Sequence, residues 1–299
     1  MLKNNDLGGG VTNPFAEYGY DEQNLWIGRR AQLIKQDVEP DYYVEYGKGF
    51  IPGSPEPSRH DTESYLTFTA NEDGSSVGFG WYKDTSGEPH VFDLQYRLGD
   101  GDWEEYTINN IEGEDVVMIP LDAGQSVQFK GNNPTGCYYG DDNNYTTLDC
   151  TMEGSISGSG DVTSLMNGVG GDIPLTPYCF IYLFSECESL TSAPNLPSTT
   201  LAEGCYSNMF SNCTSLTTVP VLPASTLVVE CYDNMFTDCT LLNEVTCLAT
   251  DITAENALAD FLTGVSHTGT FIKSPAVSEE TWREYCYFNP GWEIVDYTS

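Results

Sequence analysis

Hydrophobic and polar positions repeat with a period of 26 residues from Cys179 to about Leu248. Aligned by their cysteines, the copies read CFIYLFSECESLTSAPNLPSTTLAEG, CYSNMFSNCTSLTTVPVLPASTLVVE and CYDNMFTDCTLLNEVTCLATDITAEN. Two cysteine and two leucine positions keep this spacing in every copy: Cys179, Cys205 and Cys231; Cys187, Cys213 and Cys239; Leu190, Leu216 and Leu242; Leu196, Leu222 and Leu248. Such a period is typical of a solenoid, in which each unit buries its apolar face by stacking on its neighbours.

Within each copy the pattern predicts a short helix and then a short strand. Cys205, Met209 and Cys213 fall at i, i+4 and i+8, which is one stripe of a helix. The strand is short because proline cannot donate a hydrogen bond to a ladder. We therefore expect the solenoid over residues 177–272, and a C-terminal cap over residues 273–299, where aromatic residues break the repeat.

Alternating apolar and polar residues predict a separate β-domain before the repeat. Residues 65–70, 116–120 and 126–130 read as strands, and residues 92–108 read as a hairpin around a glycine-rich loop. Short strands with regular turns are typical of an immunoglobulin-like β-sandwich, expected over residues 64–135. Residues 136–176 then form a polar bridge and an N-terminal cap for the solenoid.

Residues 1–63 have a different character and are expected to form an arm and linker. A glycine run and a proline-rich stretch lie here, and aliphatic residues are too few for a core. A disordered terminus and a docking segment that orders against a partner both stay open. The candidate docking residues are Trp26, Arg29, Arg30, Tyr42 and Tyr43. The whole chain is thus predicted to be mainly β with short helices.

The charge of the chain limits its partners. The sequence has 45 acidic and 11 basic residues, a net charge of −34, and no Lys or Arg lies in residues 177–272. This balance argues against nucleic acid as a partner and against electrostatic docking on an anionic membrane. We also recognise no signal peptide and no run of 18 apolar residues, so we expect synthesis in a cytosol or loss of a leader.

The ten cysteines are expected to be mostly buried thiols. On a helix, the two cysteines of one repeat would lie about 12 Å apart along the axis, beyond the roughly 7 Å Cα separation that a disulfide allows. Bridges between stacked repeats stay open. Outside the regular positions, Cys137 with Cys150 is the expected disulfide. No Cys-x-x-Cys or Cys/His cluster indicates zinc.

No residue pattern indicates catalysis, so we expect the chain not to be an enzyme. The G-x-S-x-G match at residues 154–158 lies in a Gly/Ser run without the strand and helix of a nucleophile elbow. Residues 100–102 and 141–144 carry oxygen ligands that suit calcium, but a solvated turn is the favoured interpretation. We therefore expect no cofactor, with calcium left open.

Tyrosines provide the candidate surface contacts. Tyr138, Tyr139 and Tyr145 lie in a polar loop and are expected to be exposed. Tyr206 and Tyr232 share one repeat position, where they either stack on sugar rings or belong to the core. These five residues are the predicted surface-binding set.

The motif C-Y-x-N-M-F-x-x-C-T-S-L-T-x-x-P-x-L-P-A-S-T-L resembles the BspA-like leucine-rich repeats of Bacteroidetes. Those proteins place a small β-sandwich before the repeats and end in G-T-F-x-K-x-P, which stands here at residues 269–275. The resemblance covers about residues 64–299 and implies a leucine-rich-repeat solenoid used for adhesion to proteins, matrix or glycans. Similar modules are carried by phages of gut Bacteroidetes as fibre or decoration proteins.

The resemblance and the arm together predict a non-catalytic structural and adhesion protein. We expect a phage virion component on the particle exterior, held to other virion proteins by residues 1–63 and binding a bacterial surface glycan or protein. A bacterial cell-surface adhesin is the alternative, and homo-oligomerisation stays open. The small number of clear repeats and the missing leader favour the virion.

Overall fold

The computed structural model describes residues 44–45, 48–49, 63–83, 92–108, 116–141 and 144–298. It divides into two compact units, Met1–Asp61 and Thr62–Ser299. In the first unit, β1 (Val44–Glu45) pairs antiparallel with β2 (Lys48–Gly49). The predicted docking residues lie outside the described residues: Trp26, Arg29, Arg30, Tyr42 and Tyr43.

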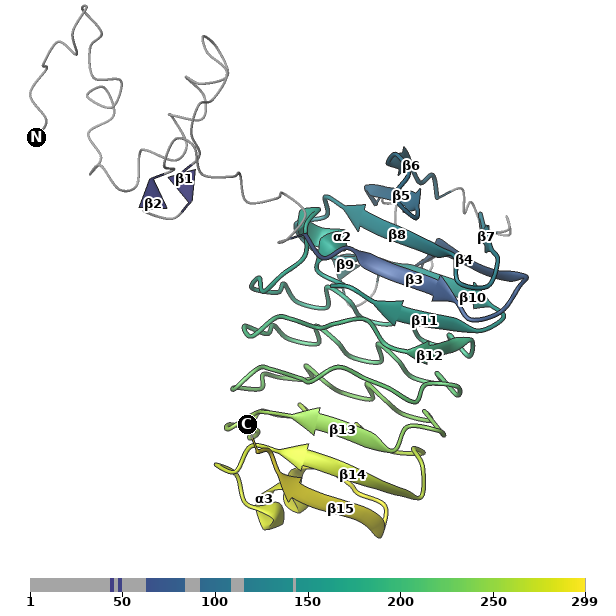
Figure 1. Cartoon of the computed structure of the whole chain (residues 1–299). Helices are drawn as coiled ribbons and strands as arrows, with labels where there is room; N and C mark the ends of the chain where they lie inside the picture. Colours follow the sequence, from purple (N-terminus) through teal and green to yellow (C-terminus); the bar gives the residue numbers. More distant parts are fainter. Residues whose placement is uncertain are drawn as a thin grey trace, which may run out of the picture. The chain divides into compact units, whose positions relative to one another are not determined.

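The chain is mainly β with few short helices, which confirms that part of the predicted fold class. In the second unit, one sheet has the order β12-β11-β3-β8-β5-β6 and another has the order β7-β4-β10-β9 (Figure 1). The first contains β3 (Leu66–Ala70), β5 (Leu94–Leu98), β6 (Glu104–Glu105), β8 (Ser126–Gly131), β11 (Ile156–Ser159) and β12 (Leu190–Ser192). The second contains β4 (Ser75–Lys83), β7 (Ile119–Leu121), β9 (Tyr138–Asp141) and β10 (Asn144–Glu153).

The two sheets share an aromatic core. Side chains alternate across a strand, so Phe68 of β3 and Phe129 of β8 point inward while their neighbours point outward. The ring centroid of Phe79 on β4 lies 4.9 Å from that of Phe129 and 6.5 Å from that of Phe68. Phe68 also lies 5.9 Å from Phe184 of the repeat region. The core therefore runs without a break from the sheets into the repeats.

Residues 136–176, expected as a polar bridge, contain β9, β10, β11 and the helix α2 (Ser164–Asn167). β10 pairs with β4 from Thr146 to Glu153. β11 pairs antiparallel with β3 and parallel with β12, so it joins the sheet to the repeats. β10 was not predicted from the sequence because the segment is rich in acidic residues and glycine. The strand signal was the Tyr-Thr-Thr-Leu run of β10, whose β-branched residues favour a strand.

The repeats form coils that stack on one another, with residues 177–202, 203–228 and 229–254 as the first three coils (Figure 1). The backbone N–H of Phe180 donates to the carbonyl of Cys205 at 3.0 Å, and Tyr206 donates to Cys231 at 3.1 Å in the same way. The extended sides of the coils continue the parallel pairing that starts at β11 and β12, through the bridge between Ser192 and Thr218. It ends in the parallel strands β13 (Glu244–Cys247), β14 (Thr268–Lys273) and β15 (Gly291–Asp296).

The helix predicted between the two cysteines of each repeat is wrong. That segment is a series of tight turns, in which Cys205 donates to the carbonyl of Ala202 while the next residue, Tyr206, donates to the next coil. Every fourth residue has a positive φ, such as Asn208 at 56° and Asn212 at 61°. A left-handed residue at every fourth position is incompatible with an α-helix. Because the turns also repeat every four residues, the stripe of buried positions was nevertheless placed correctly.

A fourth coil begins at residue 255 and extends the stack beyond the copies recognised in the sequence. Tyr232 donates to the carbonyl of Ala257 at 3.0 Å, and Asn256, Asp260 and Gly264 have positive φ as in the earlier coils. Ala257 stands where the earlier coils have cysteine, which is why the cysteine alignment missed it.

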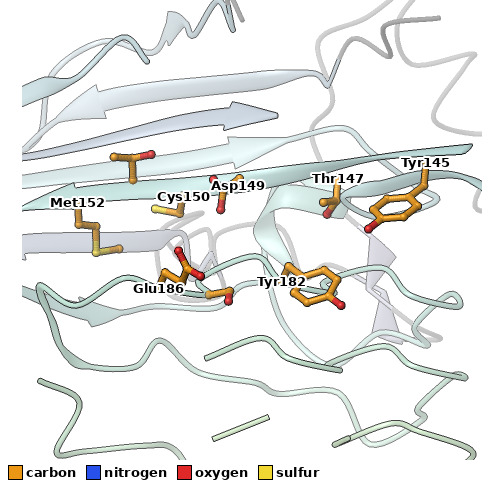
Figure 2. Close-up of a pocket in the computed structure, with 9 residues that line it drawn as sticks. Tyr145, Thr147, Asp149, Cys150, Met152, Tyr182 and Glu186 are labelled. Atoms are coloured by element: carbon orange, nitrogen blue, oxygen red, sulfur yellow. The ribbon is translucent and has the colours of Figure 1, made fainter. Parts of the chain in front are cut away.

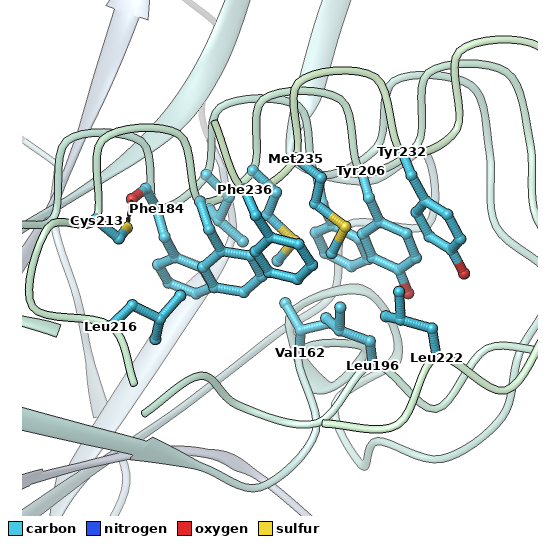
Figure 3. Packing of buried hydrophobic residues seen from close by; sticks show 14 of the residues in the cluster. Val162, Phe184, Leu196, Tyr206, Cys213, Leu216, Leu222, Tyr232, Met235 and Phe236 are labelled. Carbon is cyan, nitrogen blue, oxygen red and sulfur yellow. Dashed lines mark hydrogen bonds between the residues drawn. The ribbon is translucent and has the colours of Figure 1, made fainter. Parts of the chain in front are cut away.

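Aromatic columns fill the stack (Figure 3). Centroids in the column Phe184, Phe210 and Phe236 are 5.5 and 5.7 Å apart, and the rings are nearly parallel. Large buried rings in register on successive coils bring much apolar area out of water, which is the main favourable term in folding.

All ten cysteines are buried free thiols, so the predicted disulfide between Cys137 and Cys150 is wrong. Cys137 lies opposite Leu148, whose N–H donates to its carbonyl at 2.8 Å, and Cys150 is two residues further along the strand. The thiol of Cys187 donates a hydrogen bond to the backbone carbonyl of Cys150 at 3.0 Å. Cys213 donates in the same way to the Phe184 carbonyl. The second cysteine of the repeat thus acts as a small donor to a carbonyl of the layer before it.

The C-terminal residues cover the far end of the stack. The helix α3 (Glu279–Tyr285) begins after Ser278, whose hydroxyl accepts a hydrogen bond from the Thr281 N–H. It buries Trp282 completely, 4.7 Å from the ring of Phe271 on β14. Among the residues that the structure describes, no helix is both long and apolar enough to cross a membrane.

Candidate functional site

A surface depression of about 560 Å³, here named the tyrosine groove, lies between β10 and the first coil (Figure 2). Its lining residues are Tyr145, Thr147, Asp149, Cys150, Thr151, Met152, Tyr182, Ser185 and Glu186. β9 pairs only with residues 144–147 of β10, so the rest of that edge faces the first coil. The Cys150 N–H donates to the Leu183 carbonyl at 3.0 Å and fixes the base of the groove.

Alternation along β10 selects which side chains line one wall. Tyr145, Thr147, Asp149 and Thr151 are two residues apart and so point to one face of the sheet. Figure 2 shows Asp149 and Glu186 pointing toward one another from opposite walls. The groove therefore combines an aromatic ring, hydroxyl groups and carboxyl groups on two walls whose backbones are fixed to each other.

Tyrosine rings continue from the groove along the first coil. The ring of Tyr145 stacks on Tyr138 with centroids 5.6 Å apart, and Tyr138 lies 5.5 Å from Tyr178. The Tyr178 hydroxyl donates to Glu203 at 3.0 Å. The backbone of Gly204 supports this ring, because a Cβ there would lie 2.3 Å from it. The glycine of the second coil thus makes room for the tyrosine of the first.

The first coil differs from the others at its left-handed positions. Across the four coils, the positive-φ positions hold glycine, asparagine or aspartate, except for Glu230 and three residues of the first coil. Those three are Tyr178 at 56°, Tyr182 at 59° and Glu186 at 62°. A left-handed conformation costs an ordinary side chain roughly 1–2 kcal/mol. Strain retained in one coil, at the residues beside a groove, points to a functional constraint there.

The carboxyl group of Asp149 is tuned by its surroundings. Burial and, to a smaller extent, the carboxylate of Glu186 raise its pKa to about 6, against the opposing effect of a backbone hydrogen bond at Cys150. Asp149 therefore changes charge near pH 6. Below that pH it can both donate and accept hydrogen bonds, and above it only accept them.

Of the five residues predicted to bind at the surface, two lie together, one points elsewhere and two are buried. Tyr138 and Tyr145 lie together, while Tyr139 points to the other face of the sheet and is 53% exposed. Tyr206 and Tyr232 are only 1% exposed and stack 6.1 Å apart inside the coils, so the prediction that they bind at the surface is wrong. A ring that recurs in register on successive coils packs against its copies.

Sequence reasoning missed four residues of this region: Tyr178, Tyr182, Asp149 and Glu186. A signal for three of them was present, because the first copy departs from the later copies at these positions. Tyr182 stands where the next coils have Asn208 and Asn234. Departures from a repeat, rather than the repeated residues, mark this site.

In the described part of the chain, no group of three or more His, Cys, Asp and Glu residues is placed so that it could hold a metal ion. Of the two segments considered for calcium, Asp100 and Asp102 are exposed, and the side chains of residues 141–144 lie outside the described ones.

The site is therefore an open groove of small-ligand size, with aromatic, hydroxyl and carboxyl groups. Its volume lies within the range of pockets that bind small molecules, about 300–1,000 Å³. Comparison of the chain with family models, with curated proteins and with solved structures found no match.

Proposed function

We propose that this protein is a non-catalytic adhesion protein that binds saccharides of a bacterial surface in the tyrosine groove. In this proposal the stacked coils are a solenoid of leucine-rich repeats of the BspA-like kind, and the two sheets form an immunoglobulin-like sandwich. The hydrogen bonds between successive coils, which recur with the 26-residue sequence period, and the shared core of the two sheets support this interpretation.

One observation carries the proposal. The first coil alone places Tyr178, Tyr182 and Glu186 together at left-handed positions, where asparagine or glycine would fold more easily. An aromatic ring offers a sugar a flat apolar surface, and nearby carboxyl and hydroxyl groups accept hydrogen bonds from its hydroxyls. The groove supplies these groups in Tyr182, Asp149 and Thr151.

We further propose that the protein acts on the exterior of a phage particle, with a bacterial cell-surface adhesin as the alternative. Residues 1–63 would attach it to other virion proteins, and many copies on one particle would turn weak saccharide contacts into firm attachment. Limited proteolysis with mass spectrometry separates the two settings. An arm that is cleaved in the isolated chain and protected in intact particles supports the virion, and an arm that resists cleavage in isolation contradicts it.

Replacing Tyr182 by the residue of the later coils tests the groove directly. Tyr182→Asn introduces the residue that Asn208 and Asn234 already place at this position, so the coil is expected to fold normally. We expect binding to the surface polysaccharides of host bacteria, measured on a glycan microarray and on whole cells, to fall about tenfold or more, as for a central tyrosine of an interface.

The matched control is Tyr287→Asn, which removes a tyrosine that is 62% exposed near the C-terminus. This variant is expected to bind as the parent protein does. If Tyr182→Asn and Tyr287→Asn retain equal binding to every glycan that the parent binds, the groove is not the binding site.

A further inference from the structure

Basic side chains are scarce in the described structure, and their pairing is uneven. Those described are Arg97, Lys130, Lys273 and Arg283. Lys273 forms an ion pair with Asp296, and Arg283 forms one with Glu279 at 2.9 Å. No described carboxylate lies within ion-pair distance of Arg97 or Lys130. In a chain with 45 acidic residues, two cations that lie together without an anion require an explanation.

Arg97 and Lys130 gather instead on two aromatic rings. The Arg97 guanidinium lies 4.7 Å from the centre of the Trp103 ring and 5.3 Å from that of Tyr65. The Lys130 ammonium lies 4.3 and 5.8 Å from the same ring centres, and the two rings are 4.8 Å apart. We name these four residues the basic-aromatic cluster.

The register of the sheet brings the cluster together on its outer face. Arg97 on β5 pairs with Gln128 on β8, and Lys130 is two residues further along β8. Tyr65 precedes β3 and Trp103 precedes β6, at strands that flank β8 and β5 in Figure 1. Phe129, between Gln128 and Lys130, points into the core. The cluster therefore lies on the face of the sheet opposite the core.

Hydrogen bonds hold the cluster in place. Arg97 Nε donates to Gln128 Oε1 at 2.6 Å, and Gln128 Nε2 donates to the Thr67 hydroxyl at 3.3 Å. The carboxylate of Glu63 accepts a hydrogen bond from the hydroxyl of Tyr65, a member of the cluster. It forms no ion pair with Arg97 or Lys130. The rings offset part of the repulsion between two like charges. The two cations are thus preorganised, with their charges left for an anion.

Hydroxyl groups cover the same face of the sheet beside the cluster. Thr69 Oγ1 and Ser126 Oγ lie 2.8 Å apart, and Ser157 Oγ lies 3.1 Å from the Thr191 hydroxyl. Hydroxyl groups both donate and accept, which suits the hydroxyls of a sugar. An anionic group held by the cations would place the rest of a ligand near aromatic rings and hydroxyls.

We infer that the basic-aromatic cluster binds the terminal sugar of a saccharide when that sugar carries a single anionic group, a carboxylate or a sulfate. Arginine holds either group through two parallel hydrogen bonds, and lysine adds a point charge. A single acidic sugar on a neutral chain fits better than a polyanion, because the net charge of −34 repels an extended negative chain. The site is separate from the tyrosine groove, whose own carboxylates disfavour an acidic sugar.

The test uses the full chain and three oligosaccharides that share one neutral core. One ends in a sugar carboxylate, one ends in a sugar sulfate, and one is the uncharged parent. Binding is followed through the indole N–H signal of Trp103 in a nitrogen-15 spectrum, assigned with Trp103→Phe. We expect this signal to shift with at least one acidic oligosaccharide and not with the parent, and we expect weaker binding as salt is raised. The acidic oligosaccharide that binds more tightly identifies the group.

Charge-removing variants locate the site. Arg97→Gln and Lys130→Gln are each expected to weaken binding about tenfold, the usual effect of losing a charge-assisted hydrogen bond. Arg283→Gln removes an equal charge from an exposed ion pair and is expected to bind normally. Thermal unfolding of each variant shows whether it is folded.

Three results would overturn the inference: equal binding of the acidic and neutral oligosaccharides, no response of Trp103 to either acidic one, or an equal loss in Arg283→Gln. The outcome is also distinct from that of the groove. Tyr182→Asn should keep the acidic-sugar signal, and Arg97→Gln should keep any ligand of the groove.

Discussion

Under the proposed function, Tyr182 serves binding at the expense of stability. Its φ of 59° lies in the left-handed region, where asparagine is much better tolerated than tyrosine. We predict that Tyr182→Asn raises the free energy of unfolding by about 1 kcal/mol, the lower end of the cost of a left-handed side chain. Urea denaturation at fixed pH measures this difference.

The reciprocal change provides the control. Asn208→Tyr places tyrosine at the same position of the second coil and is expected to lower stability by a similar amount. If both substitutions destabilise the protein, Tyr182 is held by packing that outweighs its backbone strain, and the argument for a functional constraint fails.

Asp149 gives a second prediction at this scale, in the pH dependence of folding. Its pKa is about 6 in the folded chain, above the usual value near 3.8, so the folded state binds the proton more tightly than the unfolded state. The contribution of Asp149 to the free energy of unfolding is therefore fully present below pH about 4 and is lost as pH rises through about 6. The loss is at most about 3 kcal/mol.

The measurement compares the parent protein with Asp149→Asn by urea denaturation between pH 4 and pH 7. The parent should lose stability relative to the variant as pH rises, because the variant lacks this ionisation. Asp100→Asn, which removes a carboxylate at an exposed turn, is the control for the general effect of losing one negative charge. A parent that gains stability relative to Asp149→Asn over this range would contradict the assignment.

At the scale of elements, the reactivity of the thiols depends on whether the coils stay folded. Burial raises the pKa of Cys231 and of Cys239 to about 12, so almost no thiolate is present at neutral pH. We predict that all ten thiols react with a thiol reagent only as fast as the chain unfolds, and that all react at once in denaturant. A thiol that reacts rapidly in the native protein, found by mass spectrometry, would show that its coil opens separately.

The positions of the buried residues in the coils were predictable from the sequence, but the backbone conformation between the cysteines was not. The 26-residue period placed the buried Cys205, Met209 and Cys213 correctly, because burial follows side-chain spacing whatever the backbone does. The backbone itself was mistaken for a helix, since turns of four residues mimic a helical stripe. The signal for turns was the asparagine at every fourth position, as in Asn208 and Asn212, because asparagine tolerates a positive φ.

The groove could not be predicted in the same way. Tyr145 was recognised as a contact residue, but the opposite wall of the groove comes from the first coil, further along the chain. The pairing of Cys150 with Leu183 that brings them together has no local signature in the sequence. Only the departures of Tyr178, Tyr182 and Glu186 from the repeat indicated this part of the molecule.

At the scale of the whole molecule, the sheets and the coils share one hydrogen-bonded ladder. β11 pairs with β3 on one side and with β12 of the first coil on the other. We predict that Thr62–Ser299 unfolds in a single cooperative transition, with equal calorimetric and van't Hoff enthalpies. Removing residues 1–61 should leave this transition unchanged, and two separate transitions in the scan would show that sheets and coils are independent domains.

The direction of the hydrogen bonds between coils has a consequence for how the gene can evolve. In its turn segment, each coil offers carbonyls toward the N-terminal side and N–H groups toward the C-terminal side, as Phe180, Tyr206 and Tyr232 show. Any in-frame duplication of one 26-residue period inside the stack therefore inserts a unit that fits both of its neighbours. The gene can lengthen the molecule in steps of about 4.8 Å, one strand spacing at a time. The groove at one end and the aromatic cap at the other would remain unaltered by such a change.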